Sequence, residues 1–431
     1  MVAVLPQLSP ILAELEVISG RVRVLPSMRL PDDSIALMTQ GYAYLPNRRR
    51  AADGDAVELT LLGQRAVAGC GPDWTRQFYD ETYVERSEAL PGLVKNTLVG
   101  QGAVHTLDAA DHRHRKGFFL DVLDARATCR LARSVLAAWQ RAEPRWRSAD
   151  EIVLFDEAAV VLLDGVWDWA GLPETDVRDT AADMLAMVDA FGAVGPRNWR
   201  GRLARNRQER RLGSLVEEVR QGRRTATEGT LLEQAARLTT RDGEPLDPKT
   251  VAVEMLNVIR PTVATAWFVA YSAHALERNP ALRPGLASED PVLTTAFAHE
   301  VRRFYPFAPL LGGTAVTEAS WGGLTARPGD LVVLDIYGQH HHPDLWENPY
   351  RFDPHRFAGV QPDPYTFVPQ GGGSPESGHR CPGEPGVVMM LEVLLPRLAR
   401  LEYDVPAQDD RISLSRMPAR PRSGMVLRTA A

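Results

Sequence analysis

The feature that most constrains this chain is one long apolar segment, "VAVEMLNVIRPTVATAWFVAYSAHALERN", at residues 251–279. Asp247 can cap a helix there, and Pro248 suits the first helical position, where a missing backbone N–H costs nothing. The apolar residues occupy nearly the whole circumference of the helix instead of one stripe. The segment therefore predicts a central helix that the rest of the protein buries.

The composition excludes several classes of protein. The chain has 431 residues and a net charge of −6, whereas a dedicated nucleic-acid binder would be basic. No stretch approaches the ~18 apolar residues of a membrane span, and the N-terminal segment lacks the basic start of a secretory signal. Three cysteines, Cys70, Cys129 and Cys381, cannot form a disulfide framework and have no metal-type spacing. We therefore predict a cytoplasmic protein with no nucleic-acid partner and no membrane span.

The rest of the pattern is mostly helical with a minor β part. The length allows two domains or one large domain. The expected elements are a β-hairpin of residues 56–61 and 65–69, a helix at 126–139, charged surface helices within 197–224, a helix led by Asp290 and Pro291, and a final helix near 385–400.

The final helix follows a loop of unusual composition, "GGGSPESGHRCPGE", at residues 371–384. Cys381 lies at the helix start, where free backbone N–H groups and the helix dipole favour a thiolate. His379 and Arg380 add positive charge, so we expect the pKa of this thiol to be lowered. The loop glycines would let the backbone approach something large and flat, and Gly383 leads into the helix. A supported thiolate is what an axial haem ligand needs, although a lone cysteine in a turn gives the same pattern.

Two charged motifs precede this loop. "EVRRF" places Glu300 and Arg303 on one helix face, where they can pair, and "PHRF" supplies Arg356. By themselves such pairs are usually solvated surface contacts. A long central helix, E-x-x-R, P-x-R-F and a cysteine loop, in that order, resemble the cytochrome P-450 family, and the resemblance extends from near residue 10 to the C-terminus.

The resemblance implies a fold and a cofactor. The fold is mainly α with a small β region, one domain over residues 1–431 with β-rich parts near 50–70 and 310–335. The cofactor is haem b, with Cys381 as the proximal thiolate that ligates the iron. The resemblance also implies a buried charge network that braces the proximal loop, formed by Glu300, Arg303 and Arg356.

The resemblance further implies residues that meet the haem propionates. His379, two residues before the cysteine, is one of them, and Gly383 is counted with the cofactor-binding residues. "DHRHRK" offers His112, Arg115 and Lys116, of which the usual spacing favours the first and last without excluding Arg115. Without the family, this cluster is equally well a solvated basic helix start.

Two departures narrow the branch of the family. The cysteine loop is extended, because "PQGGGSPES" separates Phe367 from the cysteine. On the central helix, Arg260 and Pro261 stand where monooxygenases that split dioxygen carry a carboxylic acid and a threonine. A buried arginine is costly unless paired, and a proline frees a carbonyl of the helix ladder. A kinked helix with its arginine reaching the surface is the plainer alternative.

The Arg-Pro pair, the extended loop and "GHRCPGE" together resemble the hydrogen-peroxide-dependent fatty-acid peroxygenases of the family. The resemblance implies that Arg260 and Pro261 are catalytic residues and that Arg260 grips the substrate carboxylate. That carboxylate would replace the missing protein acid and move a proton while peroxide is cleaved. No obligatory redox partner is then expected.

The loop "LVGQGAVHTLDAADH" contributes two more candidates. Val99 stands where the family usually has an aromatic residue, which implies a wider substrate pocket. His105 falls where the branch carries glutamine or histidine, and histidine resembles the olefin-forming decarboxylases. Taken alone, such a histidine is more often a satisfied core residue.

A run of three histidines, His340 to His342, looks like a metal site but aligns with a structural turn, and we do not expect it to bind metal. The sequence thus predicts a haem-thiolate peroxygenase that hydroxylates fatty acids or decarboxylates them to terminal alkenes. Three alternatives remain open: a peroxygenase for another carboxylic acid, a monooxygenase fed by redox partners, and a non-catalytic haem sensor or carrier.

Overall fold

The computed structural model describes residues 32–87, 89, 91–376 and 378–429, so the start of the chain lies outside the described residues. Its α-helices are α2 (Ser34–Gln40), α3 (Tyr44–Ala52), α4 (Pro72–Phe78), α5 (Gly92–Val94), α6 (Ala109–Val122), α7 (Ala125–Arg147), α8 (Leu154–Trp169), α9 (Val177–Asp189), α10 (Pro196–Arg220), α11 (Leu231–Ala236), α12 (Pro248–Arg278), α13 (Arg283–Ala287), α14 (Pro291–Phe304), α15 (Ile336–His340) and α16 (Glu384–Arg400). The strands are β1 (Ala56–Leu61), β2 (Gln64–Gly69), β3 (Val84–Glu85), β4 (Ile152–Val153), β5 (Leu310–Ala315), β6 (Ala319–Trp321), β7 (Leu324–Ala326), β8 (Leu331–Asp335), β9 (Tyr403–Asp404) and β10 (Val426–Thr429).

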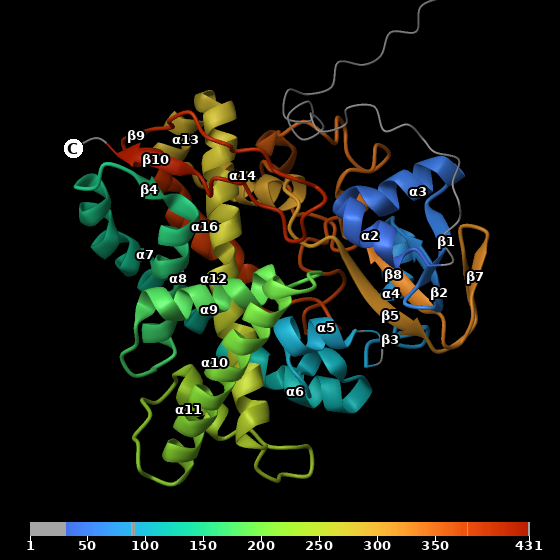
Figure 1. The fold of residues 1–431 in the computed structure, drawn as a ribbon, viewed down its shortest axis with the longest axis horizontal. Helices are drawn as coiled ribbons and strands as arrows, with labels where there is room; N and C mark the ends of the chain where they lie inside the picture. Colours follow the sequence, from blue (N-terminus) through green and yellow to red (C-terminus); the bar gives the residue numbers. More distant parts are fainter. Residues whose placement is uncertain (1–31, 88, 90, 377, 430–431) are drawn as a thin grey trace, which may run out of the picture.

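The predicted central helix is confirmed as α12, which runs through the middle of the helical part (Figure 1). The Asp247 carboxylate caps it by accepting a hydrogen bond from the Thr250 N–H at 3.0 Å. Helical structure continues through Pro261, so the proline does not end the helix as a ladder break would suggest. Arg260 is buried, and the alternative in which it reaches the surface is therefore wrong.

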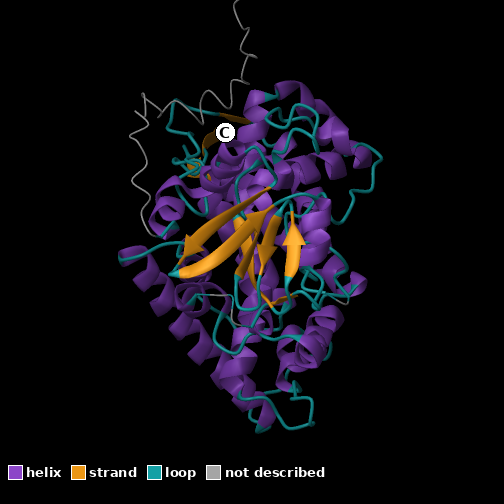
Figure 2. Ribbon diagram, turned by 90° about the vertical axis from the view of Figure 1, so that its right-hand side faces the viewer, coloured by secondary structure: helices purple, strands orange, loops and turns teal. Residues whose placement is uncertain are grey.

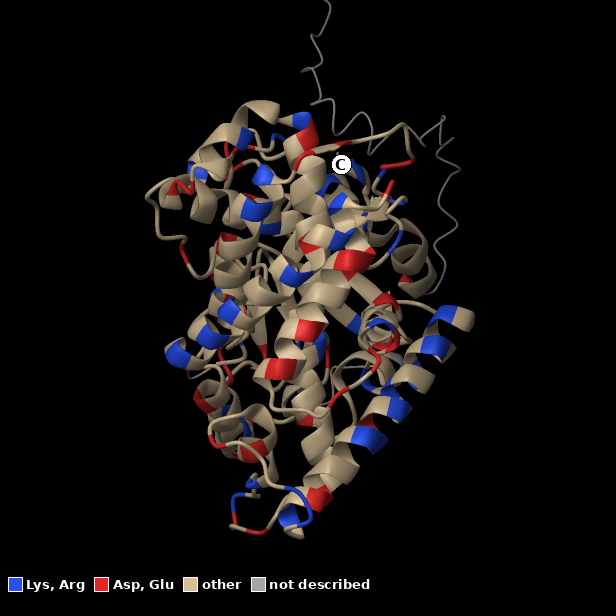
Figure 3. Ribbon diagram, turned by 90° about the vertical axis from the view of Figure 1, so that its left-hand side faces the viewer, with Lys and Arg blue, Asp and Glu red and all other residues tan. Residues whose placement is uncertain are grey.

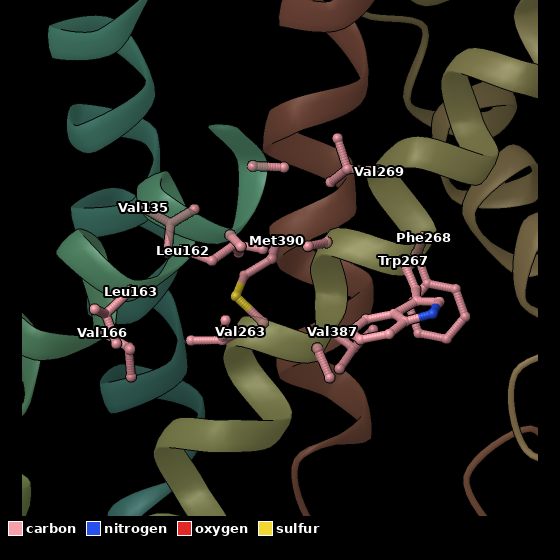
Figure 4. Close-up of a cluster of buried hydrophobic side chains, with 14 of the residues drawn as sticks. Val135, Leu162, Leu163, Val166, Val263, Trp267, Phe268, Val269, Val387 and Met390 are labelled. Atoms are coloured by element: carbon pink, nitrogen blue, oxygen red, sulfur yellow. The ribbon is translucent and has the colours of Figure 1, made fainter. Parts of the chain in front are cut away.

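The apolar circumference of α12 packs against several neighbouring helices, among them α8, α9, α10 and α16. Val263 of α12 points toward Leu162 of α8 and Met390 of α16, and Trp267 points away from these two, on another side of the helix (Figure 4). Each fully buried side chain of this size contributes roughly 1.5–3 kcal/mol to folding. The packing on several sides explains why the segment needs no polar stripe.

The β part forms one main sheet beside the helices (Figure 2). The predicted hairpin is confirmed, because β1 pairs with β2 antiparallel from Ala56–Gly69 to Leu61–Gln64. β2 then pairs in parallel with β8, and β5 and β3 complete the order β1-β2-β8-β5-β3. The two β-rich regions predicted far apart in the sequence therefore meet in one sheet.

Three other predicted helices can be compared with the structure. The helix expected at 126–139 extends as α7 to Arg147. α10 is not simply a surface helix, because Arg205, Glu209 and Leu212 on its inner face are buried. α14 begins at Pro291 as expected, with Asp290 accepting from the Val292 N–H at 2.9 Å.

Within the described part of the chain, no helix has the length and apolar character to cross a membrane.

Candidate active site

Cys381 lies three residues before α16, at the end of the glycine-rich loop. Its backbone N–H donates to the Gln370 carbonyl at 3.0 Å, which closes the loop between these two residues. The Gln370 side-chain amide lies 3.8 Å from the sulfur and is aligned to donate to it. A Cβ at Gly383 would lie 3.7 Å from the same sulfur, so the start of α16 packs closely against it.

The expected lowering of the Cys381 pKa is wrong in this structure. Burial raises the pKa of the thiol, and it outweighs the Gly383 N–H, the Gln370 amide and Lys116, which lower it. The bases that were expected to supply charge do not, because burial lowers the pKa of His379 to about 2. The Arg380 guanidinium donates to Glu384 at 2.7 Å, and the Glu384 charge itself opposes a thiolate.

The loop glycines approach protein, not a flat ligand. A Cβ at Gly371, where φ is +100°, would lie 2.6 Å from the Tyr79 hydroxyl, and one at Gly372 would lie 2.7 Å from Thr75. Contacts this short leave no room for any side chain. The glycines therefore seat the extended loop on α4 and the residue after it, which corrects the sequence interpretation.

A second charge network behind the loop was missed by the sequence reasoning. The buried Arg302 guanidinium pairs with Glu384 and donates to the Gln370 side-chain oxygen at 3.0 Å. Arg302 and Arg380 together lower the pKa of Glu384 despite its burial. Arg302 thus connects α14 to Gln370 and Glu384, which precede and follow Cys381 in the sequence. The only sequence signal was its place beside Arg303 in "EVRRF".

The predicted network of Glu300, Arg303 and Arg356 is present. The Arg303 Nε and Nη2 each donate to a Glu300 oxygen at 2.7 Å, and the Arg356 Nε lies 3.1 Å from Glu300. Glu300 and Arg303 have no exposed side-chain surface, so this is a buried pair and not a solvated one. Arg303 also donates to the carbonyls of His340 and Pro349, which holds the segment after α15.

We expect Glu300→Gln to lower the free energy of unfolding by about 3–5 kcal/mol, because it leaves the Arg303 charge buried without its partner. The measurement is the urea midpoint and the fraction of purified protein that carries haem. Glu151→Gln removes the carboxylate of an exposed pair with Arg428 and should cost at most about 1 kcal/mol. Equal effects of the two substitutions would contradict the bracing role.

His112 of α6 and His379 of the loop lie face to face. Their rings stack with centroids 3.8 Å apart and an interplanar angle of 21°. Burial lowers the pKa of His112 to about 4. His112 Nδ1 and His379 Nε2 are buried without a hydrogen-bond partner among the described residues, although the Asp108 and Glu81 carboxylates lie 3.6 and 3.9 Å from His379 Nε2. Buried polar atoms normally have partners, so these two nitrogens fit a polar group of a ligand.

Lys116 and Arg115 point to different partners. The Lys116 ammonium donates to the carbonyls of Gly378 and Arg380, at 2.8 Å for the latter, and burial lowers its pKa to about 8. Arg115 instead pairs with Glu254 of α12 at 2.8 Å. Glu254 is fully buried and also accepts from the Val104 N–H at 2.9 Å. The ion pair of Arg115 with Glu254 therefore links α6 to α12. His112 and Lys116 remain the candidate residues for contact with the haem propionates.

Arg260 is buried without an acidic partner. Its Nη2 donates to the Asn257 side-chain oxygen at 3.1 Å, and its Nε has no partner. No described Asp or Glu forms an ion pair with it. Burial and the nearby Arg205 lower its pKa to about 9, while the proximity of Cys381 acts in the opposite direction. A buried guanidinium in this state favours an incoming anion.

Val99 and His105 lie on the segment between α5 and α6. The Val99 side chain packs against Val253 of α12, and its carbonyl accepts from the Arg205 Nη2 at 3.0 Å and from the Asn257 amide at 2.9 Å. The sequence reasoning missed Arg205, which shares its neighbourhood with Arg260. The backbone of this segment is thus tied to both α10 and α12.

The His105 ring has exposed surface, yet protein surrounds it closely enough for burial to lower its pKa to about 3. The ring therefore keeps accessible surface in a space that protein groups border. Arg260, His112 and Arg205 all contribute to the lowering, so these groups lie around the same space. The ring is therefore neutral at physiological pH and a weaker base than a free imidazole.

The three histidines do not act together. His340 and His341 are buried, where His340 accepts from the Val368 N–H at 3.1 Å and His341 contacts the Tyr337 carbonyl at 2.9 Å. His342 contacts Asp55 at 2.9 Å, and Cys70 has its sulfur close to both. The run spans the end of α15 and the turn after it, and its three rings contact different partners.

The residues present fit a haem with a cysteine ligand. A sulfur with two directed N–H groups lies at one end of the site, two imidazole nitrogens that make no hydrogen bond to a described residue lie at its edge, and Arg260 lies within electrostatic range of the sulfur. This arrangement within a helical fold and one main sheet defines the haem-thiolate class of proteins. The chain belongs to the cytochrome P-450 family, whose members bind haem b through a cysteine.

Three comparisons support this membership. The sequence profile described as cytochrome P450 matches residues 289–426. The structure of cytochrome P-450SP alpha (CYP152B1) in complex with (R)-ibuprofen is 37% identical, has a TM-score of 0.89, and aligns with 93% of this chain and 98% of that one. The ligand-free structure of cytochrome P-450 OleT is 32% identical with a TM-score of 0.90, over 93% and 97% of the two chains.

A relative found by sequence alone is more distant. Cytochrome P-450 138 of Mycobacterium tuberculosis is 24% identical over 412 residues, which cover 88% of this chain and 89% of that protein. A variant of cytochrome P-450 OleT has also been solved in complex with arachidonic acid, with 32% identity and a TM-score of 0.90.

Proposed function

We propose that this protein is a peroxygenase that uses hydrogen peroxide to oxidise fatty acids next to the carboxyl group. The observation that carries the proposal is the buried Arg260, which lacks an acidic partner among the described residues. It stands on the central helix where a dioxygen-splitting enzyme needs an acid. The likeness to CYP152B1 and OleT, solved with (R)-ibuprofen and arachidonic acid respectively, adds support because both ligands are carboxylic acids.

In this proposal Cys381 ligates the haem iron, and His112, His379 and Lys116 surround the propionates. The haem, when bound, supplies the oxidising chemistry. The Gln370 amide and the Gly383 N–H direct hydrogen bonds at the sulfur, which limits the charge it donates. Glu300, Arg303 and Arg356 hold the loop from behind. The cysteine site thus needs no further protein group.

Arg260 binds the substrate carboxylate by a charge-assisted pair and so places Cα and Cβ at the reacting centre. The pKa of Arg260, although lowered to about 9, leaves the guanidinium charged at neutral pH. The bound carboxylate then moves the proton that peroxide cleavage requires, because the helix offers no acid of its own. Pro261 contributes by fixing the backbone beside Arg260.

The test is product analysis with hydrogen peroxide and no reductase, across saturated acids of increasing length. We expect hydroxy acids with water as co-product, and terminal alkenes with carbon dioxide and water. The methyl ester of the best acid is the matched control and should give less than about 5% of the acid's turnover, since it offers no charged partner to Arg260. Turnover that required an electron donor, or equal turnover of the ester, would favour the monooxygenase alternative.

His105 is expected to influence which product forms. After hydrogen loss at Cβ, the substrate radical is either hydroxylated or loses an electron and carbon dioxide to give the alkene. The neutral His105 ring can accept a hydrogen bond near Arg260, and a barrier difference of about 1.4 kcal/mol changes the product ratio tenfold. We predict a mixture that contains alkene, and His105→Gln should shift it toward hydroxy acid by about that factor.

The measurement for His105 is the ratio of alkene to hydroxy acid by gas chromatography at equal conversion. His114→Gln, at an exposed histidine on the same segment of chain, is the matched control and should leave the ratio unchanged. If the wild type yields hydroxy acids alone and His105→Gln does not change their ratio, His105 is a packing residue.

A second candidate function is supported by Val99. Val99 packs against Val253 of α12 and is smaller than the aromatic residue that the family usually has there. In this second proposal the smaller side chain widens the site for a substrate other than a straight chain. The complex of CYP152B1 with (R)-ibuprofen shows a branched aromatic acid bound to that protein. Screening aryl and branched acids beside fatty acids, with peroxide alone, distinguishes the two candidates by relative kcat/KM.

A further inference from the structure

An exposed apolar patch lies where α10 begins. Val194, Trp199 and Leu203 have relative exposures of 58%, 63% and 66%, and we call them the α10 patch. Trp199 and Leu203 are four residues apart and therefore share one helix face. Single exposed apolar residues are ordinary, but three within ten residues form a surface that water solvates poorly.

Two exposed arginines flank the patch, although the whole chain carries a net charge of −6. Residues 190–208 contain five arginines and no aspartate or glutamate, but three of the five pair with acidic residues outside this range, Arg197 with Asp189, Arg205 with Glu209 and Arg207 with Asp183. Arg200 and Arg202 are exposed, and neither forms an ion pair with any described residue. Helical spacing puts them on opposite flanks of the Trp199–Leu203 face. Figure 3 shows the basic residues in succession along the long helix at the right-hand edge.

Hydrogen bonds fix the orientation of α10, so the face that carries Trp199 and Leu203 stays exposed. On its inner side, Arg205 donates to the carbonyls of Leu98 and Val99 at 2.7 and 3.0 Å and pairs with Glu209 at 2.6 Å. These bonds hold the helix in one orientation and attach it to the wall of the candidate substrate site. The outward direction of Trp199 and Leu203 is therefore part of the fold.

We propose that the α10 patch binds the surface of an anionic lipid bilayer. Tryptophan and leucine favour the boundary between headgroups and acyl chains, and flanking arginines reach the lipid phosphates. The contact is peripheral. A second part of the proposal rests on the proposed function: a bilayer is where long-chain fatty acids dissolve, so α10 would place the substrate site beside its source.

The first experiment uses the haem-loaded protein with vesicles of phosphatidylcholine alone or with 30% phosphatidylglycerol (roughly the anionic content such assays need). Co-sedimentation should increase with the anionic lipid and fall with added salt. Trp199 also reports directly: all nine tryptophans of the chain are described, and it is the only one that is highly exposed. Its emission should shift to the blue on binding.

Paired variants separate the two contributions. Trp199→Gln with Leu203→Gln should abolish binding, whereas Val292→Gln with Val360→Gln changes two equally exposed apolar residues elsewhere and should not. Arg200→Gln with Arg202→Gln should weaken binding to anionic vesicles about 30-fold, and Arg126→Gln with Arg133→Gln on α7 should have little effect.

Several outcomes would overturn the proposal. Wild-type protein that ignores anionic vesicles, or Trp199/Leu203 variants that bind as well as wild type, would do so. A dimer in sedimentation velocity that the Trp199/Leu203 variant loses would assign the patch to a second copy of the chain instead.

A kinetic experiment tests the second part without depending on the first. The Trp199/Leu203 variant should keep wild-type turnover of a water-soluble short-chain acid and lose turnover of palmitic acid presented in anionic vesicles. Wild-type protein that oxidises neither acid would contradict the proposed function, while its vesicle binding would still decide the surface. Equal loss on both acids would contradict the delivery role.

Discussion

Arg260→Ala is expected to weaken fatty-acid binding by about 30-fold to several thousand-fold, which corresponds to the roughly 2–5 kcal/mol lost with a buried charge pair. Peroxide-driven turnover should fall with it, because the carboxylate would lose both its position and its role in proton transfer. The measurements are the substrate-induced shift of the haem spectrum and initial rates at saturating peroxide.

Two further variants make the Arg260 result specific. Arg260→Lys keeps the positive charge but cannot form a bidentate pair with a carboxylate, so the fatty-acid affinity of this variant should lie between those of the wild type and Arg260→Ala. Thr265→Val replaces a buried hydroxyl that has no hydrogen-bond partner among the described residues with a methyl group on the same helix, and should keep affinity within about two-fold. An alanine variant with wild-type affinity would show that Arg260 serves packing and that the carboxylate binds elsewhere.

Cys381→Ala is expected to remove the haem-thiolate spectrum and all peroxygenase activity. The carbon monoxide complex of the reduced wild-type protein should absorb at about 450 nm, as the family membership implies for a thiolate ligand. Without the sulfur, the two directed N–H groups at this end of the site have no anion to stabilise.

The other two cysteines are the matched controls for this experiment. Cys70→Ala changes a buried thiol beside the sheet, and Cys129→Ala changes a partly exposed one on α7. Both should retain the absorption near 450 nm. Persistence of that band in Cys381→Ala, or its loss in either control, would move the iron ligand to another residue.

Much of the architecture could be predicted because its signals are local. Asp247 and Pro248 indicate where α12 begins. Because that helix is apolar around its whole circumference, it is stable only when buried in the centre of the protein. Asp290 and Pro291 identify α14 in the same way, which also places Glu300 and Arg303 on one face. These features need only neighbouring residues and helical geometry.

The candidate site was predicted unevenly. Cys381, Arg260 and the network of Glu300 were recognised, because each stands in a motif of fixed spacing. Glu254 and Arg302 were missed, because each acquires its role from a partner more than sixty residues away in the chain. Gln370 was missed as well, because its contact with Cys381, eleven residues later, depends on how the loop between them folds. No local pattern distinguishes such residues from ordinary polar ones.

The protonation states and the contacts of the glycine loop were decided by tertiary structure alone. His105 and His379 read as bases in the sequence, but burial disfavours their charged forms. In the sequence, Gly371 and Gly372 suggested that the backbone approaches a ligand. In the structure, they allow the loop to pack closely against Tyr79 and Thr75. The sequence by itself determined which helices form and which chemical groups the chain carries. Their burial and their neighbours, and hence their charge, depend on how distant segments pack.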